Sequence, residues 1–235
     1  MNYSAPPDHE TPNRQMRSLS IKPWIIGALL VVPVAAAFWF AFGSTAPLPF
    51  DEWWHERITA KPHSATFSIA NVLHVFGSTK SMAIIAAVLT IFLIVLRRWR
   101  EAATIATTMI GVLVIVVTLK FTVERPRPVN MLVEQGGTSF PSGHSLAVAA
   151  LFTSITCIFV VHSRKKRTFT VPLVVTIAAI PLMMWSRTAL NVHWLSDTLC
   201  GALFGIALAL VVARALLRVP EEAVLAPGEQ PRQIA

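Results

Sequence analysis

Three separated stretches of this chain carry side chains suited to binding and attacking a phosphate group. KFTVERPRP holds the cations Lys120 and Arg127, and SRTALNVHWLSD holds Arg187. Two of these cations are guanidinium groups, whose fork of N–H donors suits bidentate binding of oxyanions. We therefore predict that the three cations bind the oxygens of one phosphate.

The stretch SFPSGHS adds a hydroxyl group and a histidine. Pro141-Ser142-Gly143 has the composition of a helix start, where a serine hydroxyl and free backbone N–H groups favour anions. His144 follows at once and is expected beside the same anion. We predict that Ser142 and Gly143 contact phosphate oxygens. His144 is expected to protonate the leaving oxygen and later to help activate water.

His193 and Asp197 are four residues apart, so they would share one face of a helix. A carboxylate in that position can hold one ring nitrogen, fix the tautomer and leave the other nitrogen free to attack. We predict that His193 is the nucleophile, forming a phosphohistidine, and that Asp197 orients it. The cations would stabilise the charge that develops during phosphoryl transfer.

The composition predicts a membrane protein. Of the 235 residues, 54% are hydrophobic and 14% are charged, whereas a soluble domain carries roughly 25% charged residues. The net charge of +8 falls in short clusters between apolar runs, which indicates membrane topology rather than nucleic-acid binding. The two cysteines lie inside apolar runs and lack the spacing of a disulfide framework or metal site. We expect no metal, no cofactor and no nucleic-acid partner.

The chain contains several long apolar runs. Their lengths approach the roughly 20 residues that a helix needs to cross a bilayer. We predict an all-α bundle of six transmembrane helices within residues 21–218. Residues 50–79 are expected to form outer interfacial helices, and residues 1–20 and 219–235 to be disordered cytoplasmic tails. The six predicted spans are Trp24–Gly43, Ser81–Leu96, Ala102–Leu119, His144–His162, Thr168–Trp185 and Trp194–Ala213.

Positive charge predicts the orientation of these spans, because cytoplasmic loops carry an excess of Lys and Arg. With six spans, all the basic clusters fall on one side, which is then cytoplasmic with both termini. The three stretches that carry the predicted phosphate-binding and catalytic residues would lie together on the extracytoplasmic side of the plasma membrane. The basic clusters are Arg14, Arg17 and Lys22; Arg97, Arg98 and Arg100; Arg164, Lys165, Lys166 and Arg167; and Arg214 and Arg218.

Other ionisable residues near predicted helix ends are given structural roles. Arg125 is expected to be a topological anchor whose charged end reaches the interface. His74 is expected to be a polar residue satisfied at the membrane boundary, with no part in the phosphate chemistry.

The three stretches, in order and spacing, resemble the type 2 phosphatidic acid phosphatase superfamily of integral membrane lipid phosphatases. The family pattern is K-x6-R-P, then P-S-G-H, then S-R-x5-H-x3-D, and the residues from Lys120 to Asp197 match every motif position. The resemblance implies a six-helix bundle, a metal-independent mechanism and the histidine roles given above. It also implies a substrate such as phosphatidate, phosphatidylglycerol phosphate or a polyprenyl diphosphate.

Among these substrates, a site on the outer face slightly favours the polyprenyl diphosphates, because recycling of these lipid carriers needs an outer-face phosphatase. This expectation rests on analogy with the family. A lipid-to-lipid phosphotransferase would use the same phosphohistidine step and stays open as an alternative. A non-enzymatic lipid or anion transporter could use the same cations, but transport needs no His/Asp pair. Membrane lipids surround such a protein, and no obligate protein partner is evident.

Overall fold

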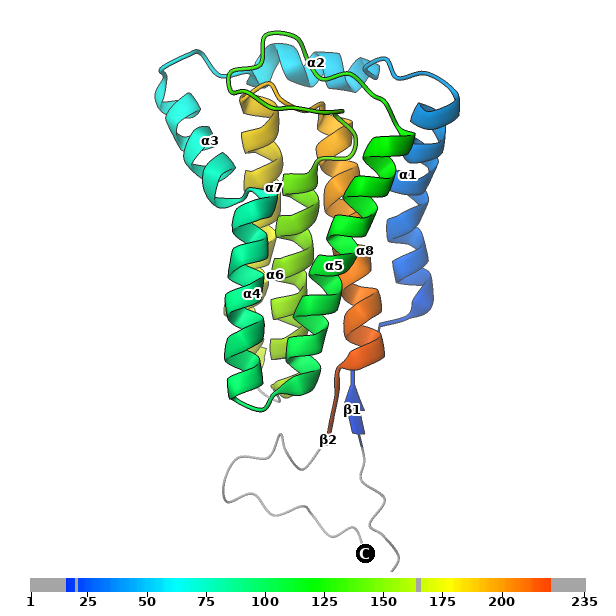
Figure 1. Cartoon of the computed structure of the whole chain (residues 1–235), viewed down its shortest axis with the longest axis vertical. Helices are drawn as coiled ribbons and strands as arrows, with labels where there is room; N and C mark the ends of the chain where they lie inside the picture. Colours follow the sequence, from blue (N-terminus) through cyan, green and yellow to red (C-terminus); the bar gives the residue numbers. More distant parts are fainter. Residues whose placement is uncertain (1–15, 20, 164–165, 221–235) are drawn as a thin grey trace, which may run out of the picture.

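The computed structural model describes residues 16–19, 21–163 and 166–220. In Figure 1, α1 and α4 to α8 run side by side along the long axis of the molecule, and α2 lies across one end. The helices of the described residues are α1 (Pro23–Phe42), α2 (Pro49–Ile58), α3 (Ala65–Phe76), α4 (Thr79–Val95), α5 (Trp99–Thr122), α6 (Gly143–His162), α7 (Lys166–Ala189) and α8 (Leu195–Leu216).

Five of these helices are long and apolar enough to cross a membrane on their own: α1, α5, α6, α7 and α8. The predicted second span corresponds to α4, which has only 17 residues. It qualifies together with α3, to which it is joined through a bend of 47°. The chain is therefore a multi-pass helical membrane protein with five spans, or six when the bent α3–α4 pair counts as one.

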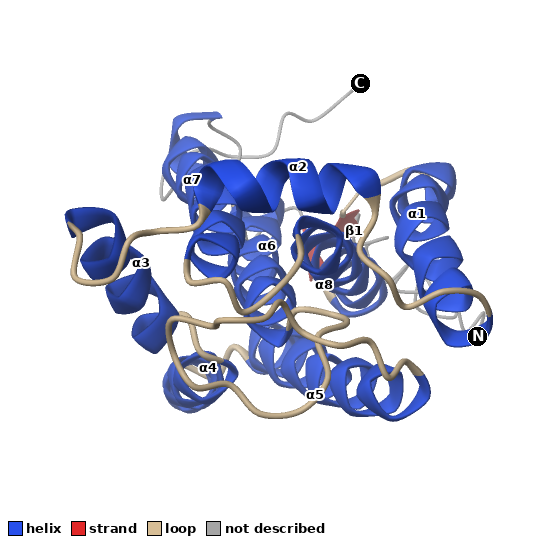
Figure 2. Cartoon of the chain, turned by 90° about the horizontal axis from the view of Figure 1, so that it is seen from above, coloured by secondary structure: helices blue, strands red, loops and turns tan. Residues whose placement is uncertain are grey.

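The segment predicted to form outer helices contains α2 and α3, which lie at one end of the bundle. Seen from above in Figure 2, α2 crosses the ends of α7 and α8. Trp54 Nε1 donates to Thr188 Oγ1 at 3.0 Å, and the backbone of Ala60 donates to the Ala189 carbonyl at 2.9 Å. These bonds fasten the outer segment to the end of α7.

The opposite end carries the strands β1 (Met16–Ser18) and β2 (Arg218–Pro220), which pair antiparallel. The all-α prediction missed this pair, because polar flanking residues give no signal for a ladder between chain segments so far apart. Met16–Ser18 also lies inside the stretch predicted as a disordered tail. Residues 1–15 and 221–235 of the predicted tails lie outside the described residues.

The central helix of the bundle is α6. In its apolar 18-residue stretch 78% of the residues are buried, against 11% in the corresponding stretches of α1 and of α7. Its closest partner is α8, and glycine makes the contact possible. A Cβ atom on Gly201 would lie 2.6 Å from the Ser142 carbonyl oxygen, and one on Gly205 would lie 2.4 Å from that of Leu146. Small residues let helix backbones approach closely in membranes. This packing holds the first turns of α6 and α8 side by side.

Candidate active site

The predicted site residues all lie at the end of the bundle that α2 covers. They come from four helices and two loops, although more than seventy residues separate the first from the last. Lys120 is in the last turn of α5, Arg127 in the loop that follows, Ser142 at the N-cap of α6, Gly143 and His144 in its first turn, Arg187 in the last turn of α7, His193 in the α7–α8 loop, and Asp197 in the first turn of α8.

His193 reaches the site from a turn, and it does not share a helix with Asp197 as the spacing predicted. Helix α7 ends at Ala189 and α8 begins at Leu195. Between them, Asn191 has a φ of 57°, a left-handed conformation that asparagine tolerates better than most residues. Its amide also donates to the Val129 carbonyl at 2.6 Å. The turn is thereby tied to the loop that carries Arg127.

The hydrogen bonds of His193 define its tautomer. Arg127 Nη1 lies 3.1 Å from His193 Nε2, and because a guanidinium can only donate, Nε2 must be the acceptor. The ring proton is therefore on Nδ1. The unprotonated nitrogen, Nε2, thus accepts from an arginine that could also bind phosphate.

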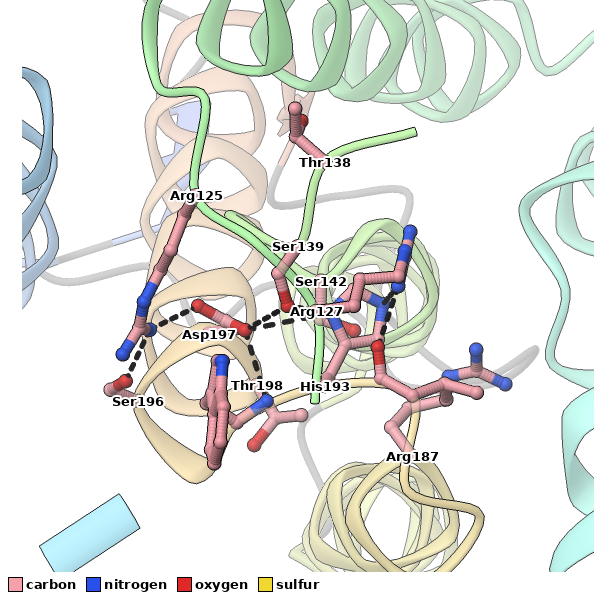
Figure 3. A network of polar contacts seen from close by, with 12 residues as sticks. Arg125, Arg127, Thr138, Ser139, Ser142, Arg187, His193, Ser196, Asp197 and Thr198 are labelled. Atoms are coloured by element: carbon pink, nitrogen blue, oxygen red, sulfur yellow. Dashed lines mark hydrogen bonds and ion pairs between the residues drawn. The ribbon is translucent and has the colours of Figure 1, made fainter. Parts of the chain in front are cut away.

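The Nδ1 side of His193 faces Ser139 and Asp197. Ser139 Oγ lies 3.4 Å from Nδ1 and donates to Asp197 Oδ2 at 2.5 Å. Asp197 Oδ2 itself is 3.7 Å from Nδ1, which is too far for a direct hydrogen bond. The carboxylate therefore acts on His193 through Ser139, a residue that motif spacing did not single out (Figure 3).

The surroundings of His193 keep it neutral. Burial lowers the pKa of His193 well below its ordinary value, and the charges of Arg127, Arg187 and Lys120 lower it further, while a hydrogen bond with the Ser139 backbone opposes them. A neutral imidazole has the lone pair that nucleophilic attack requires. The same three charges are those predicted to hold the phosphate.

The loop between α5 and α6 holds two of the cations by its carbonyl groups. Arg127 donates to the carbonyl oxygens of Gly136 and Gly137, each at 3.0 Å, and to that of Val192 at 2.6 Å. Lys120 Nζ donates to the Thr138 carbonyl. Burial lowers the pKa of Arg127 to about 10, with Asp197 opposing the shift, so Arg127 stays charged at neutral pH.

Arg187 is fully buried, yet part of its guanidinium has no partner. It contacts His74 Nδ1 through Nη1 and donates to Gln135 Oε1 at 3.0 Å through Nη2. Its Nε is buried without a hydrogen-bond partner among the described residues. An unpaired buried donor on a cation is unfavourable, and an oxyanion beside Arg187 would satisfy it.

Ser142 and Gly143 form the start of α6 as predicted from their composition. Ser142 Oγ accepts from the Ser145 backbone at 3.5 Å and from the Ser145 hydroxyl at 3.2 Å. Its own backbone N–H donates to the Asp197 carbonyl at 3.1 Å. The Ser142 hydroxyl proton and the first amides of α6 are thus available to an anion.

Arg125 is not the interface anchor that the sequence analysis predicted. Its side chain is completely buried, with Nη2 2.8 Å from Asp51 Oδ2 and Nη1 2.5 Å from Asp197 Oδ1. It also donates to Ser196 Oγ at 2.7 Å and lies over the ring of Phe40. The prediction was wrong because the partner acid lies 74 residues away, a separation that hides the pairing from local sequence.

His74 also has a different position from the one predicted. It lies on α3, with Nδ1 3.1 Å from His144 Nε2 and in contact with Arg187. The structure therefore brings a third histidine to the site. Within the described ranges, no group of three or more His, Cys, Asp or Glu side chains is arranged to hold a metal ion.

The helices of membrane-spanning length define a multi-pass membrane protein, and buried cations and histidines gather at one end of its bundle. A family model described as the PAP2 superfamily matches residues 101–220, and the chain belongs to that superfamily. Its fold is similar to that of the first transmembrane PAP2 type phosphatidylglycerolphosphate phosphatase from Bacillus subtilis. The two share 21% identity with a TM-score of 0.66, over 81% of this chain and 94% of the other. A comparison with curated proteins gives no match.

Proposed function

We propose that this protein is a lipid phosphatase that hydrolyses a phosphate monoester or diphosphate through a phosphohistidine on His193. The observation that carries the proposal is the arrangement around this imidazole. Its unprotonated Nε2 lies 3.1 Å from Arg127 Nη1. Buried Arg187, whose Nε has no hydrogen-bond partner among the described residues, is another of the cations close enough to lower the pKa of His193. A phosphate there would meet both a nucleophile and cations that stabilise its oxygens.

In the first step, His193 Nε2 attacks phosphorus and the P–O bond to the leaving group breaks. The bonding electrons pass to the leaving oxygen, which takes a proton from the imidazolium form of His144 and leaves that ring neutral. In the second step, a water gives a proton to His144 and its oxygen attacks phosphorus. The P–N bond breaks, its electrons return to His193, and phosphate leaves.

The nonbridging oxygens would be held by Lys120, Arg127 and Arg187, with Ser142 and the Gly143 amide at the start of α6. Asp197 and Ser139 would stabilise the proton on His193 Nδ1 as the imidazole becomes phosphorylated. These roles need no group beyond the side chains and amides of the chain itself, so we propose a metal-independent reaction.

We propose that the site faces the extracytoplasmic side of the plasma membrane. In Figure 1 the site end, under α2, is opposite the end that carries β1 and β2. The turn between α4 and α5, with Arg97, Arg98 and Arg100, lies at that opposite end. An excess of Arg and Lys is typical of cytoplasmic loops, so this polarity supports cytoplasmic termini and an outward-facing site.

The substrate class is a lipid that carries phosphate or diphosphate. The Bacillus subtilis protein of similar fold is named a phosphatidylglycerolphosphate phosphatase, which makes that lipid one candidate. Polyprenyl diphosphate is a second candidate, because its recycling needs a phosphatase on the outer face, and phosphatidate is a third.

Purified protein in detergent, with EDTA present, tests the proposal. Phosphate release from a panel of polyprenyl diphosphate, phosphatidate and phosphatidylglycerol phosphate is expected, and its relative rates identify the substrate. His193→Ala should abolish release, and acid-quenched protein should carry phosphate on His193. Turnover that survives His193→Ala would refute the nucleophile, and transfer of phosphate to an added lipid in place of water would identify a phosphotransferase.

No release from any of these lipids would instead favour a transporter. That alternative has no specific observation in its support, because binding and transport leave the neutral His193 and its Ser139–Asp197 partners without a role.

A further inference from the structure

His74, on the outer helix α3, contacts two residues of the phosphate site through one atom. Its Nδ1 lies 3.1 Å from His144 Nε2 and also contacts Arg187 Nη1. The rings of His74 and His144 stack with their centroids 5.0 Å apart. A guanidinium only donates hydrogen bonds, so His74 Nδ1 must be an unprotonated acceptor.

The direction of the second bond follows from the first. Because His74 Nδ1 has no proton, His144 Nε2 must carry one and donate a hydrogen bond to His74 Nδ1. The contact therefore fixes the orientation and tautomer of His144. Its other nitrogen, Nδ1, is left to take up the second proton of the imidazolium form, and this is the proton that can pass to a substrate oxygen.

Helix α3 is held in the position that makes this contact. Ser186 Oγ donates to the Ala70 carbonyl at 2.6 Å, and both residues are buried. Ala70 is one helical turn before His74. At the end of α3, Gly77 packs so closely that a Cβ atom would lie 1.8 Å from Met183 Cε. The helix that carries Arg187 thus also holds the helix that carries His74.

We propose that His74 is a positioning residue that holds His144 as the acid of the reaction. The proposal rests on the function proposed above. In its acid form His144 is an imidazolium with a proton on each ring nitrogen. When the P–O bond breaks, its electrons go to the leaving oxygen, the Nδ1 proton of His144 passes to that oxygen, and His144 is left neutral with its proton on Nε2. His74 Nδ1 meanwhile accepts from His144 Nε2–H, so the ring stays aimed as its charge changes. The same principle operates where a carboxylate orients a catalytic histidine.

The leaving group distinguishes this role from a structural one. An alkyl phosphate monoester, such as phosphatidate, needs a proton on its leaving oxygen, whereas p-nitrophenyl phosphate releases a stable phenolate. General acid catalysis contributes roughly 10²–10⁴-fold where it is needed. His74→Ala should lower kcat on phosphatidate by about 10–100-fold, a partial loss of that factor, and should leave kcat on p-nitrophenyl phosphate nearly unchanged.

Two variants complete the experiment. His74→Asn keeps an acceptor, because the asparagine Oδ1 occupies the place of the histidine Nδ1, and should retain activity on both substrates. His63→Ala is the matched control, since His63 is an exposed histidine of the same outer segment that lies against Phe67. It should change neither rate.

Equal loss on both substrates in His74→Ala would overturn the proposal in favour of a structural role. A lower KM with unchanged kcat would also overturn it, in favour of a residue that merely covers the site. If the wild-type protein hydrolyses neither substrate, the proposed function fails, and ¹⁵N-histidine NMR then decides about His74. In neutral His144, a proton on Nε2 that His74→Ala displaces supports the proposal, and a wild-type neutral His144 that carries its proton on Nδ1 alone refutes it.

Discussion

A fully buried arginine, Arg125, links helix α2 to Asp197, the acid proposed to act on His193. Its guanidinium lies between Asp51 and Asp197, and Asp51 also accepts from the backbone and hydroxyl of Ser196, each at 2.7 Å. The one guanidinium donates to both carboxylates, and the Ser196 hydroxyl accepts from Arg125 and donates to Asp51. The network therefore tolerates burial as a unit but not the loss of one member.

Arg125→Ala is expected to destabilise the protein strongly. Removing one partner of a buried ion pair typically costs about 3–5 kcal/mol, because the remaining charge is left buried and unpaired. Thermal unfolding in detergent measures the change. Arg57→Ala is the control, since Arg57 pairs with Glu56 on the surface, where such a pair contributes about 0–1 kcal/mol. Equal melting temperatures for the two variants would contradict the network's role.

Asp197→Asn is expected to lower the rate more than the affinity. The carboxylate accepts from Ser139 and Arg125 and reaches His193 through Ser139, so it would support the proposed nucleophile without binding phosphate. Replacing the equivalent acid of a catalytic triad by its amide lowers kcat by about 10⁴-fold. We expect kcat to fall by at least about 100-fold with KM little changed. Steady-state kinetics would contradict this if KM rose at constant kcat.

The pKa of His193 predicts how activity responds to acid. The imidazole attacks only when unprotonated, and its pKa is well below the ordinary value because of burial and the neighbouring cations. Protonation is therefore delayed to lower pH, and kcat/KM should not fall as pH drops through about 6.5, the ordinary histidine value. The unfolded chain does take up this proton, so His193 lowers the stability of the fold as pH falls below that value.

A pH profile of kcat/KM in the wild-type protein measures the first effect. Replacing Arg127 by Met removes one of the neighbouring charges and should move any acid-side loss toward higher pH. A midpoint near the ordinary histidine value in the wild type, unchanged in Arg127→Met, would contradict the assignment.

At the scale of elements, the glycines of α8 decide how closely α6 approaches. Gly201 and Gly205 face the backbone at Ser142 and Leu146, where a Cβ has no space. Gly205→Ala is expected to push the two helices apart and to cost about 1–3 kcal/mol, the usual penalty of overpacking. Activity should fall too, because the first turns of α6 and α8 carry His144 and Asp197.

The matched control for this prediction is Gly27→Ala in α1. A Cβ atom on Gly27 meets nothing within 4 Å, so the variant should keep both its melting temperature and its rate. Full activity in Gly205→Ala would show that the α6–α8 distance does not position the site.

Most of the long helices could be predicted from local sequence, because a run of apolar residues bounded by charges is a local signal. The predicted spans Trp24–Gly43 and His144–His162 coincide with α1 and α6 to within one residue at each end, and Thr168–Trp185 lies inside the longer α7. The bend between α3 and α4 was not foreseen, and it lies beside Gly77, which packs closely against Met183 of α7. The β1–β2 pair depends on two segments that meet only in the fold.

At the scale of the whole molecule, the bundle has a basic end and a site end. Single cysteines test the proposed orientation, because Cys157 and Cys200 are buried and give little background labelling. In intact cells, a membrane-impermeant maleimide should label Glu134→Cys, an exposed position in the α5–α6 loop. It should label Arg97→Cys, in the exposed α4–α5 turn, only after permeabilisation. The reverse pattern would place the site on the cytoplasmic side.

Residue type and spacing were enough to predict which side chains would gather as a phosphate site, because each motif is short and its chemistry is carried by neighbouring residues. Composition and apolar runs were likewise enough to predict a helical membrane protein. Only the folded chain revealed Asp51 beside Arg125, Ser139 between Asp197 and His193, and His74 against His144. These contacts join residues that are distant in the chain, and they depend on helix packing and buried charge compensation, which no local pattern encodes.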